Sequence, residues 1–313
     1  MIYKKIIAVL FLWTTFIGMS TASTREEIKV VWGFSINSNL ANTVRLMCEE
    51  INQSQDKYTF VLVNKLGAGG TIAANAVSAD PNNTIVSMSS SFITRPYFET
   101  KTLTHNLDQF TPILVQGIGS PLYVLSNRIR DIDQLIKKPN ATIGVGGIGT
   151  ISHLVAFELQ KLNPSINIIY FKSNMEATVA AAGEHIDATI GFVSDSQGLI
   201  DSKKLHIIGY TGNQLLGENK KLMLVNHSIP ESANLVTDYA MYASTKMDPD
   251  RFNEIRSLLI KANNSQLVKN RYARDNLLPV NYNTVQSEVW YSVRRVFWQR
   301  QIEELKKRGG LPE

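Results

Sequence analysis

Short segments rich in β-branched residues alternate along most of this chain with longer amphipathic segments. Each short segment is bounded by Gly, Asn or Pro and therefore predicts a strand. Strands that alternate with helices predict an α/β fold with parallel sheets covered on both faces, whose ligands bind beyond the carboxyl ends of the strands. The predicted strands are IKVVW (28–32), YTFVLV (58–63), TIVSM (84–88), PILVQ (112–116), LYVLS (122–126), ATIGV (141–145), INIIYF (166–171), IDATI (186–190) and LHIIGY (205–210).

The intervening segments carry apolar residues at helical spacing, so each predicts a helix with one face toward the core. The chain has 313 residues, more than one hydrophobic core usually organises, which predicts two lobes. Cys48 is the only cysteine of the sequence and excludes an intrachain disulfide. Three predicted core stripes are Leu40, Val44, Met47 and Ile51; Ile151, Leu154, Val155 and Leu159; and Val285, Val289, Val293 and Phe297 of a long final helix.

The first residues have the pattern of a secretory signal peptide. Lys4 and Lys5 precede an apolar run over residues 6–19, and small residues at 20–22 predict cleavage after Ala22. A transmembrane anchor is the alternative, but the run is short for a bilayer and no stop-transfer pattern follows it. Residues 1–22 are therefore expected to be removed during export, with no stable membrane insertion afterwards.

The charge of the chain gives no sign of a nucleic-acid partner. The formal net charge is +5, and it falls to about +3 without the signal peptide, which carries two lysines and no acid. The basic residues are spread along the chain rather than gathered in a block. One cluster near the C-terminus is mixed with Glu303 and Glu304, which predicts a solvated helix face, a membrane-surface or partner role being the alternative. It comprises Arg294, Arg295, Arg300, Lys306, Lys307 and Arg308.

Two glycine loops stand out, one in NKLGAGGTIAANAV (64–77) and one in GVGGIGTISHL (144–154). Each follows a predicted strand and runs into a predicted helix, where unpaired N–H groups and the positive end of the helix dipole attract an anion. Each loop could therefore hold a carboxylate or a phosphate. Thr71 in the first loop, and Thr150 or Ser152 in the second, would either cap the helix or give a hydroxyl to the ligand.

The second loop also has the G-x-G-x-x-G spacing of a dinucleotide site, at Gly144, Gly146 and Gly149. Such a site needs an acidic residue after the next strand to hold the ribose hydroxyls, but YFKSN stands there. Lys172 could meet a 2′-phosphate in principle. A nicotinamide-dependent enzyme is thus the weaker interpretation, and no cofactor is expected.

Other catalytic patterns find little support. The histidines at 105, 153, 185, 206 and 227 form no pair at metal-ligand spacing. His153 follows Ser152 directly, and neighbours on a helix point about 100° apart, so the two are not a base and its nucleophile. His153 is expected to pack against its helix, with the cleft as the alternative. Lys172 is expected to form a surface ion pair, with an anionic ligand as the alternative.

Four segments together resemble the substrate-binding proteins of tripartite tricarboxylate transporters, the Bug-type family. They are VNKLGAGGTIAANAVSADPNNTIVSM, GVGGIGTISHLVAFEL, IIYFKSNMEATVAAAGEHIDATIG and KLHIIGYTG. The family's usual forms, in the same order, are V-x-N-x-x-G-A-G-G, G-S-x-G-x-G-S-x-x-H-L, P-Y-K-G and G-x-x-D, and Gly183 and Asp187 correspond to the last one with one more residue between them. The resemblance implies a two-lobed periplasmic flytrap that encloses a carboxylate.

The resemblance also implies how the chain divides and where it binds. Crossover strands at 112–126 and 235–244 would join a discontinuous first lobe (23–119 and 237–313, with Trp290 and Trp298) to a second lobe (120–236). Backbone N–H groups and bridging water would do much of the binding. The implied ligand contacts are Phe34, Ser35, Asn37, Ser38, Gly67, Ala68, Gly69, Gly70, Thr71, Ser89, Ser90, Gly146, Gly147, Gly149, Thr150, Ser152, Ser194 and Asp195.

One loop departs from the family pattern. Where the family has Pro-Gly-Gly followed by Asp, this chain has Asn37 and Ser38 at the glycine positions and Ala41 near the Asp position. The far end of the ligand would then be recognised differently, or the loop is merely repacked with Asn39 capping its helix.

The resemblance implies a monomeric solute-binding protein whose partners are a small carboxylate and integral-membrane transporter subunits. The alternatives are a sensory or adhesive module of the same fold and a secreted enzyme.

Overall fold

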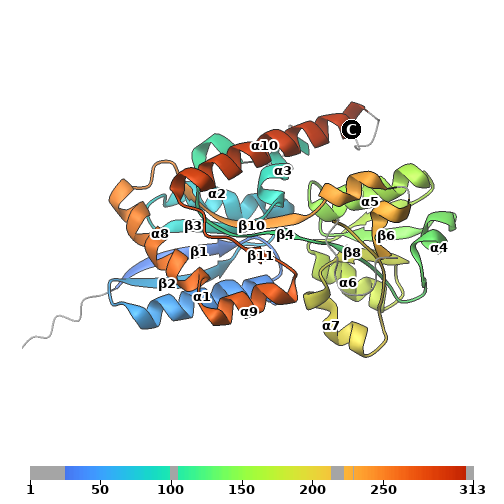
Figure 1. Ribbon diagram of the computed structural model, residues 1–313, viewed down its shortest axis with the longest axis horizontal. Coiled ribbons are helices and arrows are strands. Elements are labelled where there is room, and N and C mark those ends of the chain that lie inside the picture. The colour runs from blue at the N-terminus through green and yellow to red at the C-terminus, as the bar shows by residue number, and fades with distance from the viewer. Residues whose placement is uncertain (1–24, 99–104, 213–221, 228, 308–313) are drawn as a thin grey trace, which may run out of the picture.

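The computed structural model describes residues 25–98, 105–212, 222–227 and 229–307. The chain forms two lobes that lie side by side, each built on its own sheet (Figure 1). The predicted signal peptide and Arg308 lie outside the described residues. None of the helices in the described part is both long and apolar enough to cross a membrane.

The first lobe contains a six-stranded sheet in the order β11-β4-β10-β3-β1-β2. β1 pairs in parallel with β2 and β3, whereas β10 and β11 pair antiparallel with β4, and β10 also pairs antiparallel with β3. Every residue of β3 is buried, as expected for a strand covered on both faces. The strands are β1 (Glu26–Trp32), β2 (Tyr58–Asn64), β3 (Thr84–Ser89), β4 (Phe110–Ser120), β10 (Thr237–Ser244) and β11 (Leu278–Pro279).

The second lobe contains a five-stranded sheet in the order β7-β6-β8-β5-β9. β6 pairs in parallel with β7 and β8, and β5 pairs antiparallel with β8 and β9. The strands are β5 (Tyr123–Ser126), β6 (Thr142–Val145), β7 (Asn167–Tyr170), β8 (Ala188–Gly191) and β9 (His206–Tyr210).

The chain passes twice between the lobes. It leaves the first sheet at the end of β4 and enters the second at β5, and it returns to the first sheet with β10 (Figure 1). β10 and β11 run opposite to the other strands of the first sheet, and β5 runs opposite to its neighbours in the second. Both sheets are therefore mixed, and the expectation of parallel sheets is wrong for these strands. The limits of the second lobe at residues 120 and 236 stay a prediction.

Helices cover both faces of the sheets, and most of them begin at a side chain that caps the first turn. Ser38 accepts a hydrogen bond from the backbone of Ala41, and Thr150 does the same for His153. The first lobe has α1 (Asn39–Ser54), α2 (Thr71–Ala79), α3 (Ser91–Phe98), α8 (Pro249–Asn263), α9 (Gln266–Arg274) and α10 (Thr284–Lys307). The second lobe has α4 (Ile132–Lys137), α5 (Ile151–Leu162), α6 (Asn174–Ala182) and α7 (Val193–Asp201).

All nine predicted strands are confirmed, and so are the core stripes of α1 and α5. The stripe predicted for the final helix is wrong, because Val285, Val289 and Val293 are all more than half exposed. The opposite side of α10 is buried instead, where it packs on α3 and β4. The large side chains decide the orientation: Tyr291, Trp298, Ile302 and Leu305 are buried there.

The basic cluster of α10 is not one solvated face. Arg300, Lys306 and Lys307 are exposed as expected, but Arg294 turns inward. Its Nε lies 2.6 Å from the carboxylate of buried Asp238. The expectation is therefore wrong for Arg294, since a buried carboxylate needs a nearby positive charge.

Candidate ligand-binding site

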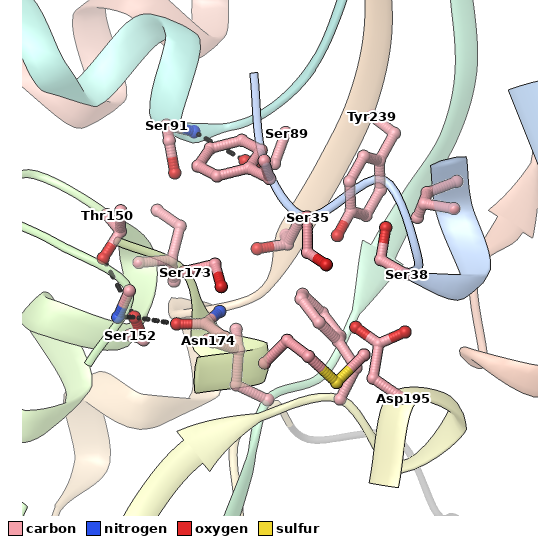
Figure 2. Close-up of a pocket in the computed structure, with 18 of the residues that line it drawn as sticks. Ser35, Ser38, Ser89, Ser91, Thr150, Ser152, Ser173, Asn174, Asp195 and Tyr239 are labelled. Carbon is pink, nitrogen blue, oxygen red and sulfur yellow. Dashed lines mark hydrogen bonds between the residues drawn. The ribbon is translucent and has the colours of Figure 1, made fainter. Parts of the chain in front are cut away.

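A cavity lies between the two lobes at the carboxyl ends of their parallel strands (Figure 2). The space open to water in it is about 50 Å³. The first lobe contributes Trp32, Phe34, Ser35, Ser38, Leu40, Ser89, Ser91, Thr237, Tyr239 and Asp275 to the lining. The second lobe contributes Leu122, Gly146, Thr150, Ile151, Ser152, Ser173, Asn174, Met175, Phe192 and Asp195.

Among the residues that the structure describes, five helices begin at this cavity. They are α1, α3, α5, α6 and α7, and each places its cap or first-turn residues in the lining. One helix N-terminus carries about half a positive charge, worth roughly 0.3–1 kcal/mol to a nearby anion. Five converging on one enclosed space make it favourable for an anionic group.

The second glycine loop (residues 146–149) and the start of α6 form one side of the cavity. The Ser152 hydroxyl accepts a hydrogen bond from the Gly146 N–H at 3.2 Å and donates one to Asn174 Oδ1 at 2.9 Å. It also lies 2.9 Å from the Thr150 hydroxyl, as Figure 2 shows. This network fixes four polar groups from three segments around the same space.

Two carboxylates lie on the other side of the cavity. Asp195 belongs to α7 of the second lobe, and its Oδ1 accepts a hydrogen bond from the Asn39 N–H of the first lobe at 2.7 Å. Asp275 of the first lobe accepts hydrogen bonds from the Asn39 amide and from the Ser194 hydroxyl. These contacts join the lobes, so the structure is a closed one on this side.

Burial changes the protonation of these groups. Burial, together with the nearby charge of Asp275, raises the pKa of Asp195 to about 7 against the lowering effect of the Asn39 N–H. Burial also raises the pKa of Asp275, opposed by hydrogen bonds from Ser194 and Asn39. Burial and both carboxylates raise the pKa of Tyr239 well above its usual value.

The first glycine loop (residues 67–70) lies against the second loop rather than against the cavity. A Cβ added at Gly69 would be 3.1 Å from the carbonyl oxygen of Ile148, and one added at Gly149 would be 3.0 Å from Cδ of Arg95. The Arg95 Nε donates to the Ala68 carbonyl at 3.3 Å. The Thr94 hydroxyl donates to the Gly149 carbonyl across the lobes.

The structure brings some of the sequence-predicted contacts together in the lining and places others outside it. Those in the lining are Phe34, Ser35, Ser38, Ser89, Gly146, Thr150, Ser152 and Asp195. Those outside it, although described, are Asn37, Gly67, Ala68, Gly69, Gly70, Thr71, Ser90, Gly147, Gly149 and Ser194. The role of either group in binding stays a prediction.

Several lining residues were missed by the sequence analysis. Ser173 and Asn174 follow β7, and their place after a parallel strand is a signal that could have found them. Tyr239 lies inside a crossover strand and Asp275 follows α9, positions without any such signal.

Three residues for which the sequence left alternatives open have defined surroundings in the structure. Asn39 does not cap α1, because Ser38 does. Thr71 does not cap α2 either, and its buried hydroxyl has no hydrogen-bond partner in the described chain. Lys172 is exposed and makes no ion pair with a described residue, so the expected surface pair is wrong; its backbone N–H bonds Glu176.

His153 packs inside the second lobe, as expected. It is 1% exposed, its Nδ1 accepts the Gly149 N–H at 3.2 Å, and its Nε2 lies 3.0 Å from the Tyr170 hydroxyl. Burial lowers the pKa of His153 to about 4, so the ring is neutral near pH 7. In the described residues, no group of three or more His, Cys, Asp or Glu side chains is placed to hold a metal ion.

The fold and the cavity define a two-lobed periplasmic-binding-protein architecture. The sequence profile described as "Tripartite tricarboxylate transporter family receptor" matches residues 44–305. The chain belongs to this family, which is a family of solute receptors and not of enzymes. No curated protein matches the chain in sequence.

Solved structures share the fold at low sequence identity. The periplasmic binding protein BugD is 19% identical with a TM-score of 0.81, over 93% of this chain and 100% of that chain. Rpa4515 of R. palustris, with adipate, is 15% identical with a TM-score of 0.80, over 92% and 99%. MatC of Rhodopseudomonas palustris, with bound malate, is 15% identical with a TM-score of 0.77, over 88% and 99%.

Proposed function

We propose that this protein is an extracytoplasmic solute-binding protein that encloses a small organic carboxylate between its lobes. The observation that carries the proposal is the convergence of five helix N-termini on one cavity between the lobes. Receptor-family membership supports it, as do the adipate and malate held by two proteins of the same fold. The site works by binding alone, without metal, nucleotide or chemical conversion.

Binding and closure are coupled in this proposal. The cavity lining comes from both lobes, so a solute reaches all of its contacts only when the lobes meet. The solute binds the closed state more tightly than the open state. This difference in binding free energy shifts the equilibrium between the two states toward the closed one. The closed, loaded monomer is then the form that integral-membrane transporter subunits receive in the periplasm, after the signal peptide has been removed.

A thermal-shift panel of mono-, di- and tricarboxylates and amino acids, with NADPH as the control, tests this function. A solute at about one hundred times its Kd stabilises the folded state by about 2.7 kcal/mol, which raises the Tm by a few degrees. We expect at least one carboxylate to do so and NADPH to have no effect. A shift with NADPH alone would contradict the proposal.

A further inference from the structure

The cavity lining is unbalanced in charge for a site that encloses an anion. Its described residues include two carboxylates, Asp195 and Asp275, and no Lys, Arg or His. The helices α5 and α6 begin around Ser152 and Asn174, on the side away from Asp195 (Figure 2). The helices α1 and α7 begin on the Asp195 side, where the carboxylates offset the positive ends of these two helices. The cavity therefore has one side that favours a negative group and one side that opposes it.

The hydroxyl of a buried tyrosine lies beside the two carboxylates. Tyr239 is 3% exposed and lines the cavity, and although its backbone pairs with β3 and β4, its hydroxyl makes no hydrogen bond with any residue that the structure describes. Figure 2 shows its hydroxyl pointing into the same space as the Asp195 carboxylate. Buried tyrosine hydroxyls usually find a partner, so this one points to a group that a ligand brings.

Asp195 also keeps one oxygen for a ligand. Its Oδ1 accepts the Asn39 N–H, whereas its Oδ2 has no partner in the described part of the chain. Both oxygens of Asp275 are occupied, by Asn39 and Ser194, so this residue adds charge rather than a free acceptor. A ligand group here therefore meets a carboxylate oxygen and a phenol oxygen, next to a second carboxylate.

An ammonium group satisfies this side of the cavity better than any other common solute group. It offers three N–H donors and a positive charge, and both Asp195 Oδ2 and the Tyr239 oxygen can accept. A second carboxylate of the solute would instead lie beside two carboxyl groups whose pKa is already raised, so it would be repelled by their charge or would have to bring a further proton into the cavity.

We infer that the solute is an amino acid, whose carboxylate binds at the N-termini of α5 and α6 and whose ammonium group binds Asp195 and Tyr239. The inference rests on the proposed carboxylate-binding function and names the substrate class of the same cavity. Asp195 and Tyr239 select for the ammonium group by direct contact. Asp275 and Asn39 position the Asp195 carboxylate.

Calorimetry with matched pairs that differ only in the ammonium group tests this inference. The pairs are aspartate and succinate, glutamate and glutarate, and alanine and propionate. We expect the amino acid of at least one pair to bind about 30-fold or more tightly than its partner, as for other buried charge pairs. Asp195→Asn keeps the shape and the Asn39 contact but removes the charge, and it should abolish that preference.

Asp201→Asn is the matched control, because Asp201 lies on the same helix but outside the cavity and bonds only Gln197. It should bind like the unaltered protein. Equal or tighter binding of the plain carboxylates, or an unchanged preference in Asp195→Asn, would overturn the inference and leave the proposed function standing. If the protein bound neither the amino acids nor the plain carboxylates, the proposed function would be overturned, and the inference with it.

Discussion

Two glycine loops of this molecule each join a parallel strand to a helix, yet they have different surroundings. The second loop (residues 146–149) contributes Gly146 to the cavity lining, and its helix is capped by Thr150. The first loop (residues 67–70) packs against the second loop and Arg95, and its helix has no side-chain cap. The same local design thus lines the cavity in one lobe and packs against the other lobe in the second case.

Backbone conformation separates the loops as well. All four residues of the first loop have positive φ, including Ala68 at 48°. In the second loop only Gly147 and Gly149 do, and Gly146 keeps an ordinary conformation while its N–H bonds Ser152. Position 146 requires glycine because Asn174 lies too close to leave room for a Cβ. Position 70 requires glycine because of its left-handed φ and because Met88 lies beside it.

The largest expected effect is on binding through the second loop. In Gly146→Ala the new Cβ would lie 2.3 Å from Asn174 Oδ1 and 2.8 Å from the Asn174 backbone nitrogen. The loop must then move away from α6, and we expect affinity for the solute to fall about 100-fold, close to 3 kcal/mol, by calorimetry. Gly198→Ala is the control, since its Cβ meets nothing within 4 Å. Normal binding by Gly146→Ala would remove the second loop from the site.

A change in the first loop should lower stability rather than affinity. Gly70 has φ 95°, and an added Cβ would lie 1.9 Å from Cε of buried Met88. We expect Gly70→Ala to lose about 2 kcal/mol and about 5 °C in Tm.

The loss in Gly70→Ala has two causes, the strain of an alanine at positive φ and the clash of its Cβ with Met88. Gly119→Ala has the first cause alone, because φ is 79° there and its Cβ meets nothing within 4 Å. It should lose less stability than Gly70→Ala. If Gly70→Ala keeps its Tm and loses binding, the first loop contacts the solute after all.

The contact between α3 and the second loop should change how readily the lobes close. Thr94→Val keeps the shape of the buried side chain but removes its hydrogen bond to the Gly149 carbonyl. A loss of about 1 kcal/mol from the closed state weakens solute binding about five-fold. Small-angle scattering of the solute-free variant should show a larger radius of gyration.

Thr245→Val is the matched control for this change, because its hydroxyl contacts Gln109 at 3.4 Å in an exposed position of the first lobe. It should scatter and bind like the unaltered protein. An unchanged radius of gyration and an unchanged affinity for the solute in Thr94→Val would show that this hydrogen bond does not hold the lobes together.

A further effect is expected from pH, through the contact on the acidic side of the cavity. Burial raises the pKa of Asp195 to about 7, from about 3.9 in an unfolded chain. The folded protein then holds the proton more tightly, so this contribution to stability is fully present below about pH 4 and is lost as pH rises through 7.

A thermal scan series measures this change. The Tm should fall by a few degrees between pH 4 and 7.5 in the unaltered protein, and less in Asp195→Asn. Identical pH profiles for the two would show that Asp195 keeps an ordinary pKa.

Much of the fold follows from periodicity, because strand and helix patterns are local. The nine strand segments and the stripes of α1 and α5 are of this kind. The reversed direction of β5 and β10 is not local, since it depends on the passages between lobes. The exposed valines of α10 were misread because β-branched spacing resembles a core stripe, whereas Trp298 and Tyr291 decide which side is buried.

The site was predictable where it follows strands and unpredictable where it depends on closure. Gly146, Thr150 and Ser152 belong to a glycine loop that follows a predicted strand, and the family resemblance implied them together with Ser89 at the end of β3. Asp275 enters the cavity only because the lobes meet, and nothing near it in the sequence marks that contact. The place of the first loop likewise depends on which surface of the other lobe it faces.

A crystal structure of the protein with aspartate or succinate, whichever calorimetry favours, tests the central claim most directly. The account predicts a solute carboxylate about 3 Å from backbone N–H groups or hydroxyls of Gly146, Ser152 and Asn174. It predicts no contact between the solute and residues 67–70, which should stay packed on Ile148 and Arg95. A carboxylate bound to the N–H groups of Gly69 and Gly70, with residues 146–149 apart from it, would contradict the account.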